Sequence, residues 1–254
     1  MVRLGQNFLA DTNLLDAIVR EAGVDAGDVV LEVGGGEGVL TERLASAARA
    51  VHVIELDERL RRKLEELAER AASVHVVFGD AMQVDLAGLQ PAPTVVVANL
   101  PYSIATPLLL RTMAELPGVR RWTVMVQREI ADRLRGRPGT KAYGAPSVLA
   151  QLTCRVELLR TVDPAVFRPR PRVESALLRF ERAGPWPGEA VARLVHGAFA
   201  HRRKALARSV GIAGVASRER TLAALEAAGL PQRARAEELV PEDFVRLAVE
   251  LGRG

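Results

Sequence analysis

An apolar run that ends in a glycine-rich turn sets the strongest limit on how this chain of 254 residues can fold. The run Val29–Val33 is predicted to be a buried strand, and it leads directly into glycines at positions 34, 36 and 38. The next segment, Val39–Ala47, is predicted to be a helix. Strand, glycine turn and helix in this order are typical of a doubly wound α/β fold whose turn holds a nucleotide-like ligand.

The spacing of these glycines narrows the choice of ligand. The dinucleotide pattern G-x-G-x-x-G would need a glycine at position 39, which is Val39. Read from Glu32, the pattern is E-x-G-x-G-x-G, the form shown by S-adenosylmethionine-dependent methyltransferases. We therefore predict S-adenosylmethionine as the cofactor, with Gly34 and Gly36 in its site. The alternative is a glycine turn of purely structural origin.

Acidic residues follow the next two predicted strands. The strand that begins at Val51 ends in Glu55, at the distance from the glycine turn expected for a ribose ligand, and its carboxylate can accept hydrogen bonds from both ribose hydroxyls. The strand that begins at Val74 is followed by Asp80, which is placed to meet the adenine amino group of a nucleoside cofactor. The alternatives are a solvated acid at a strand end for Glu55 and an ordinary turn aspartate for Asp80.

The fourth predicted strand leads into Asn99, Leu100, Pro101 and Tyr102. An amide, a proline-fixed bend and an aromatic ring therefore arrive together at a strand end, which suits a flat, amino-bearing base. We expect the Asn99 side-chain oxygen and a backbone carbonyl at Leu100 or Pro101 to accept hydrogen bonds from the amino group. Tyr102 is expected to stack on the base.

Charge is distributed unevenly along the chain. Residues 1–110 carry 9 basic and 16 acidic side chains, whereas residues 111–254 carry 26 and 15. An acidic first part beside a basic second part favours a small-molecule site in one and a polyanion-binding surface in the other. Arg137 and Lys141 lie in a basic glycine-proline loop that is either a contact for phosphates or a solvated linker. An arginine-rich composition can also arise from base-composition bias.

A second basic segment, residues 163–172, combines prolines with one aromatic residue. Phe167 is interleaved with Arg168, Arg170 and Arg172, as in a loop that stacks on a base and contacts phosphates. The alternative is that Phe167 fills the core beneath a loop.

The segment Ala183–Gly188 is the clearest linker, and it predicts two domains. Residues 1–182 are predicted to form a methyltransferase domain with a mostly parallel sheet. Residues 183–254 are predicted to form a small, basic, all-helical domain that binds RNA or the ribosome, with helices at 189–200, 201–210, 217–228 and 241–251. Its basic run is Arg202, Arg203 and Lys204.

Several other classes of protein are disfavoured by the composition. The single cysteine, Cys154, excludes an internal disulfide, and no cysteine or histidine pair has the spacing of a zinc site. No apolar run has the length of a membrane span, and the start of the chain lacks the pattern of a signal peptide. We therefore expect a cytoplasmic protein without a metal and without membrane association.

Nine short motifs occur in order along nearly the whole chain. They are Gly5–Leu9, Glu32–Gly38, Glu55–Asp57, Gly79–Ala81, Asn99–Tyr102, Arg137–Gly144, Phe167–Ser175, Ala198–Lys204 and Arg235–Leu239. Together they resemble the ribosomal RNA adenine N6-dimethyltransferase family, and they are most similar to its small-subunit (16S rRNA) type. One departure is Gly35, which stands where the family usually has proline.

The resemblance implies a Rossmann-like class I methyltransferase fold with a seven-stranded sheet. It implies that Asn7, Leu9 and Asn99 join Gly34, Gly36, Glu55 and Asp80 at the cofactor, and that Phe167 faces the target base together with the Asn99–Tyr102 turn. The implied reaction is the N6,N6-dimethylation of two adjacent adenosines near the 3′ end of 16S rRNA, in an assembling particle, by a monomer. The alternatives are a large-subunit (23S) rRNA dimethyltransferase that confers antibiotic resistance and a mainly non-catalytic assembly factor.

Overall fold

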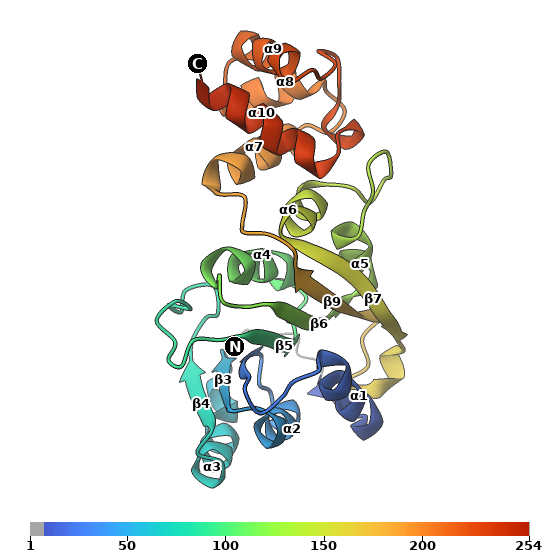
Figure 1. The fold of residues 1–254 in the computed structure, drawn as a ribbon. Helices are drawn as coiled ribbons and strands as arrows, with labels where there is room; N and C mark the ends of the chain where they lie inside the picture. The colour runs from blue at the N-terminus through green and yellow to red at the C-terminus, as the bar shows by residue number, and fades with distance from the viewer. Residues whose placement is uncertain (1–7, 254) are drawn as a thin grey trace. The chain divides into compact units, whose positions relative to one another are not determined.

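A computed structural model describes residues 8–253 of the chain, and its main feature is a seven-stranded sheet (Figure 1). The strand order is β4-β3-β2-β5-β6-β9-β7. The strands are β2 (Val29–Val33), β3 (Ala50–Glu55), β4 (Val74–Phe78), β5 (Val95–Asn99), β6 (Arg121–Gln127), β7 (Cys154–Val162) and β9 (Ser175–Arg182). The first five strands in this order, from β4 through β3, β2 and β5 to β6, are parallel to one another. Strand β9 pairs with β6 in the antiparallel direction. The predicted seven-stranded, mostly parallel sheet is therefore confirmed.

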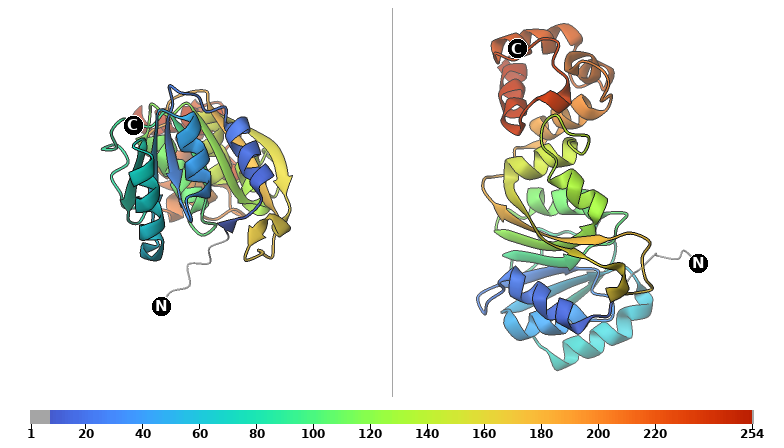
Figure 2. Two further views of the ribbon diagram at one scale, coloured as in Figure 1. Left: turned by 90° about the horizontal axis from the view of Figure 1, so that it is seen from below. Right: turned by 90° about the vertical axis from the view of Figure 1, so that its right-hand side faces the viewer.

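Helices cover both faces of this sheet. Three helices lie side by side on one face, and α4 lies on the other (Figures 1 and 2). The first three are α1 (Thr12–Ala22), α2 (Val39–Ala47) and α3 (Arg61–Arg70, preceded by the 3-10 turn η1, Glu58–Leu60), and α4 is Ala105–Glu115. Because parallel strands connected by helices are buried on both faces, β2, β3 and β5 consist mostly of apolar residues.

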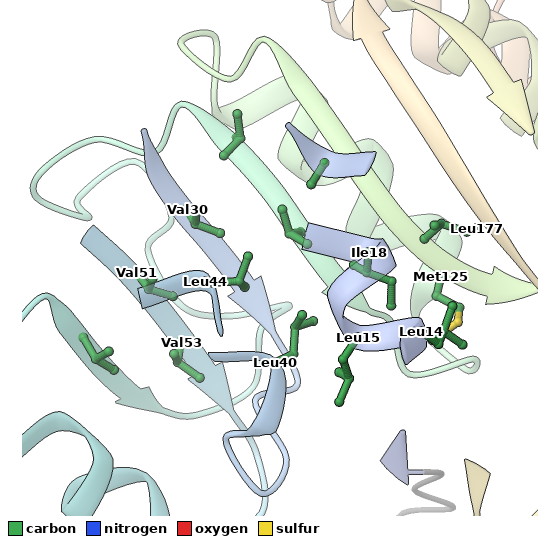
Figure 3. Close-up of a cluster of buried hydrophobic side chains, with 14 of the residues drawn as sticks. Leu14, Leu15, Ile18, Val30, Leu40, Leu44, Val51, Val53, Met125 and Leu177 are labelled. Carbon is green, nitrogen blue, oxygen red and sulfur yellow. The ribbon is translucent and has the colours of Figure 1, made fainter. Parts of the chain in front are cut away.

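The core on the α1–α3 face is built from alternate residues of the strands (Figure 3). Val30, Val51 and Val53 point to this face and pack against leucines of the helices, such as Leu40 and Leu44 of α2. On the opposite face, the buried indole of Trp122 in β6 donates a hydrogen bond of 3.0 Å to the Thr112 hydroxyl of α4. Both layers therefore hold the carboxyl ends of the parallel strands in a fixed arrangement.

A separate two-stranded sheet joins the first described residues to a segment far along the chain. Strand β1 (Phe8–Leu9) pairs antiparallel with β8 (Phe167–Arg168), which follows the 3-10 turn η2 (Pro164–Val166). Leu9 lies opposite Phe167, and the Ala10 amide donates to the Val166 carbonyl at 2.9 Å. This pairing places Phe8 and Leu9 beside the proline-rich segment.

The chain forms two compact units. Unit 1 extends to Ala131 and resumes over Val156–Arg182, while unit 2 contains Asp132–Arg155 and the residues from Ala183 onward. This division has a boundary after residue 182, as does the predicted one, but it groups residues 132–155 with the C-terminal unit, whereas the sequence placed them in the first domain. The reason is packing: α6 (Ala145–Thr153) packs against α7 and α10, and the Tyr143 ring meets Phe199 edge-on at 5.7 Å. Helix α5 (Arg128–Leu134) spans the border between the units.

Unit 2 is helical in its C-terminal part, as predicted. The elements there are α7 (Glu189–Phe199), α8 (Leu206–Ile212), α9 (Arg218–Ala227), the 3-10 turn η3 (Ala236–Glu238) and α10 (Pro241–Arg253). The prediction of a helix over 201–210 was wrong for its first half. Residues 201–204 form a turn in which the Lys204 amide donates to the His201 carbonyl at 2.8 Å.

Candidate active site

The site lies where the direction of the strand order changes. Strand β2 pairs with β3 on one side and with β5 on the other, so the loops that leave β2 and β5 diverge at their carboxyl ends. Ligands of open α/β sheets bind at such a switch point. A pocket of about 320 Å³ is found there, lined by Phe8, Leu9, Glu32, Glu55, the glycine turn and Asn99–Ser103.

The glycine turn has a backbone that only glycine adopts readily. Gly34, Gly36 and Gly38 have φ angles of 81°, 57° and 81°, and a Cβ on Gly36 would lie 3.2 Å from the Phe8 ring. Gly35 is constrained differently, because a Cβ there would lie 2.4 Å from Cγ1 of Val53. A proline at position 35 would therefore require Val53 to move. Glycine at this position is consistent with the packing in this chain.

Glu55, at the end of β3, is held in place by three backbone amides. Its Oε2 accepts from Gly36 at 2.9 Å, and its Oε1 accepts from Leu56 at 2.9 Å and from Asp57 at 2.8 Å. A carboxylate has about four acceptor positions, so one position on Oε2 is left for a ligand hydroxyl. A second ligand hydroxyl would have to replace the Gly36 amide.

The turn after β5 forms another wall of the pocket. The buried Leu100 donates its amide to the Met125 carbonyl at 3.1 Å, which ties the turn to β6. The Pro101 carbonyl already accepts the Ile104 amide at 3.1 Å, so the Leu100 carbonyl is the better of the two predicted backbone acceptors. Asn99 and Tyr102 both line the pocket.

Tyr102 is anchored at its hydroxyl, which lies 2.8 Å from Oγ of the buried Ser175 in β9. Burial raises the pKa of Tyr102, and the hydrogen bond to Ser175 only partly opposes this effect. The ring therefore stays neutral near pH 7, and one end of it is fixed. Such a ring is suited to act as a stacking surface.

Glu32 is a residue of this site that the sequence reasoning did not single out. Its side chain is only 1% exposed, yet it lines the pocket, and its Oε2 has no hydrogen-bond partner among residues 8–253. Burial raises its pKa to about 8, the Thr41 hydroxyl opposes this, and the nearby Glu55 adds to it. The available signal was its place in the motif, since an acid inside a fully buried strand must have a partner or remain neutral.

The other predicted cofactor residues are only partly brought together. Leu9 lines the pocket, whereas Asn7 lies outside the described residues. Asp80 follows β4 but does not line the pocket; its Oδ1 accepts the Met82 amide at 2.8 Å. The geometry of Asp80 is thus that of an ordinary turn aspartate, and a role at the cofactor stays a prediction.

The prediction that Phe167 faces the target base is contradicted in this conformation. Its ring is fully buried and belongs to the apolar core that includes Leu14 and Val162. An aromatic ring without exposed surface offers no face for stacking. The alternative, a side chain that fills the core beneath a loop, is what the structure shows, because the β1–β8 pairing directs Phe167 inward.

The predicted RNA-binding residues are distributed over both units. In unit 1, Arg168, Arg170 and Arg172 are exposed, and Arg170 lies 3.8 Å from the exposed Asp163. In unit 2, Arg137, Lys141 and Arg203 are exposed, Lys204 is half-buried, and Arg202 is engaged in internal hydrogen bonds. No group of three or more potential metal ligands occurs within residues 8–253. Over the same range no helix has the length and apolar character needed to cross a membrane.

The fold and the site together define a class I methyltransferase: a seven-stranded sheet in which β9 runs antiparallel to β6, with a pocket beside the glycine turn. A family model described as ribosomal RNA adenine dimethylase matches residues 2–252. The chain belongs to this family, which confirms the resemblance seen in the motifs.

Individual proteins agree with this assignment. The chain is 44% identical to the ribosomal RNA small subunit methyltransferase A of Rubrobacter xylanophilus, over 96% of this chain and 92% of that relative. The crystal structure of a dimethyladenosine transferase from Plasmodium falciparum superposes with a TM-score of 0.82 at 24% identity, covering 97% and 98% of the two chains. The 23S rRNA methyltransferase ErmE is less similar in structure, with a TM-score of 0.67 at 30% identity and coverage of 97% and 100%.

Proposed function

We propose that this protein transfers methyl groups from S-adenosylmethionine to N6 of two adjacent adenosines near the 3′ end of small-subunit rRNA, in an assembling particle. The observation that carries the proposal is the position of Asn99 and Tyr102 on the wall of a pocket that also contains the glycine turn and Glu55. Family membership and the 44% identity to a small-subunit enzyme support the substrate.

The residues of the pocket fit S-adenosylmethionine. The vacant acceptor position on Glu55 suits a ribose hydroxyl, and the positive φ angles of the glycine turn allow close approach of a ligand. The cofactor carries an ammonium group, and the unpartnered Oε2 of the buried Glu32 suits a cation. When bound, the cofactor would supply an electrophilic methyl group on a sulfonium, from which a neutral thioether is a good leaving group. Asp80 and Asn7 remain part of the proposed cofactor site.

What the chain must add is position and polarisation of the target nitrogen. The lone pair of the adenine amino group is delocalised into the ring, so the nitrogen is a poor nucleophile. The Asn99 side-chain oxygen and the Leu100 carbonyl accept hydrogen bonds from this amino group. Both interactions favour tetrahedral geometry at the nitrogen and make its lone pair available for in-line attack. The base reaches the pocket after leaving its stack, and Tyr102 then stacks on it.

The activity is tested with the purified protein, labelled S-adenosylmethionine, and undermethylated small and large ribosomal subunits as separate substrates. We expect N6,N6-dimethyladenosine to form in small-subunit rRNA at two adjacent positions. Mapping the label by mass spectrometry of rRNA fragments identifies the sites. Methylation of the large subunit alone would overturn the proposal and favour the ErmE-like activity, for which the structural similarity is the supporting observation.

Glu55→Ala is expected to weaken cofactor binding by about tenfold or more, because one lost hydrogen bond to a charged acceptor costs about 1.5–3 kcal/mol. The change also leaves three backbone amides without their acceptor, so thermal unfolding is measured in parallel. The dissociation constant is measured by titration calorimetry. Glu58→Ala, which removes an acid from the exposed turn η1, is the matched control. Unchanged binding by Glu55→Ala would exclude the ribose role.

A further inference from the structure

The turn around Arg202 connects three segments of unit 2 that are far apart in the sequence. The Arg202 guanidinium donates from Nη2 to the Thr140 carbonyl at 2.8 Å and from Nη1 to the Lys141 carbonyl at 2.7 Å. Its Nε donates to Oε2 of Glu237 in η3 at 2.7 Å. One side chain therefore joins the loop 137–141, the turn 201–204 and the segment 235–238. We call this arrangement the Arg202 clamp.

Other contacts within unit 2 show that the loop is held in a defined conformation. The Gly139 amide donates to the Glu237 backbone carbonyl at 2.7 Å, and Gly139 has a φ of 79°, which favours glycine. The Thr140 hydroxyl donates to the Arg137 carbonyl at 2.7 Å, which closes the turn. The Arg235 amide donates to the Glu238 carboxylate at 2.7 Å, so the third segment has its own local cap. The clamp thus joins pieces that are already ordered locally.

The clamp also determines which charges face the solvent. Glu237 is paired with Arg202, while Arg137, Lys141, Arg203 and Arg235 on the same three segments are exposed. The side chain of Arg202 itself is 38% exposed, and three of its five N–H groups are used internally. The guanidinium of Arg202 therefore holds segments of the protein together, and it is not directed at a ligand.

We propose that Arg202 acts with Glu237 as the positioning device of an RNA-binding surface, holding the loop 137–141 so that its cations lie beside those of the other two segments. This rests on the proposed function, because it takes rRNA as the polyanion. It also corrects the expectation that Arg202 is itself a phosphate contact. A pre-ordered loop binds more tightly than a free one, since the backbone entropy of its residues is not lost on binding.

Two substitutions separate positioning from simple electrostatics. Arg202→Lys keeps the charge but cannot reach three acceptors at once, and Glu237→Ala removes a negative charge. Electrostatics alone predicts unchanged RNA affinity for the first and tighter binding for the second. The clamp predicts that both lower the affinity by about tenfold, and that the double variant is no weaker than either single one.

The controls are Arg203, an exposed cation of the same turn whose side chain takes no part in the Arg202 contacts, and an ion pair on another element. Arg203→Ala should lower the RNA affinity, and it should reduce the salt dependence of binding by the contribution of one phosphate contact. It should not alter the conformation of the loop. Glu250→Ala, which breaks the pair with Arg253 in α10, should leave RNA binding unchanged. Affinity is measured with the full chain on undermethylated small subunits at several salt concentrations. Cofactor affinity, measured in the same variants, should stay at the wild-type value.

Hydrogen exchange of peptides that cover residues 137–141 reports the position of the loop without RNA. We expect faster exchange at the Gly139 amide in both clamp variants and no change in Arg203→Ala. Glu237→Ala that binds RNA as tightly as the wild type, or unchanged exchange in both clamp variants, would overturn the inference. Failure of the wild-type protein to bind small subunits would instead overturn the proposed function, and with it the RNA-positioning role.

Discussion

Asn99→Ala is expected to abolish methyl transfer while leaving the affinity for S-adenosylmethionine within about tenfold of the wild type, or about 1.4 kcal/mol. The side-chain oxygen is proposed to act on the target nitrogen, and an interaction made in the transition state affects turnover more than binding. Loss of one such preorganised group typically costs about 10²–10³ in rate.

The measurement is single-turnover methyl transfer to undermethylated small subunits, with cofactor affinity from calorimetry. Ser103→Ala, at an exposed position on the same pocket, is the matched control and should retain activity. Asn99→Asp keeps an acceptor at the same position and should retain more activity than the alanine variant. Near-normal turnover by Asn99→Ala would contradict the proposed mechanism.

Binding of S-adenosylmethionine at pH 7 is expected to release close to one proton from Glu32. Burial raises the pKa of this carboxyl to about 8, so it is mostly neutral in the free protein at pH 7. A cation next to the carboxyl favours the ionised form and lowers the pKa. The proton count follows from calorimetric titrations in buffers of different ionisation enthalpy. Glu32→Gln should bind without proton release and more weakly, whereas equal proton release in both proteins would exclude the role.

The same residue makes stability depend on pH, with a sign that can be checked. Its folded pKa of about 8 lies above the ordinary value of 4.5, so ionisation of Glu32 opposes folding. The contribution of Glu32 to the free energy of unfolding is constant below about pH 4.5. As the pH rises from there to about 8, this contribution destabilises the folded state increasingly. Glu32→Gln lacks this loss, so its stability relative to the wild type should grow by up to about 1.4 kcal/mol per pH unit within that window. Denaturant unfolding without cofactor, from pH 5 to pH 8, measures the difference.

The sequence was sufficient for features that depend on local pattern. Glycines at alternate positions after an apolar strand indicated a doubly wound α/β fold with a ligand-holding turn after β2, because positive φ angles and fully buried strands leave a strong pattern in the sequence. It was not sufficient for side chains whose environment is set by distant segments. In a basic, proline-rich loop, the ring of Phe167 could either stack on a base or pack in the apolar core. Only the strand pairing that places Phe167 opposite Leu9 shows that the ring packs in the core.

The sequence by itself thus determined the family and the two turns that line the pocket, since Asn99–Tyr102 and the glycine turn are contiguous motifs at strand ends. Tertiary structure alone decided which charges are used internally. Arg202 and its two neighbours form one basic run in the sequence, yet its guanidinium is directed at Glu237 and at two carbonyls more than sixty positions away. The protonation state of Glu32 also depends on the tertiary structure. Its pKa is set by burial and by the charge of Glu55, and a sequence motif specifies neither.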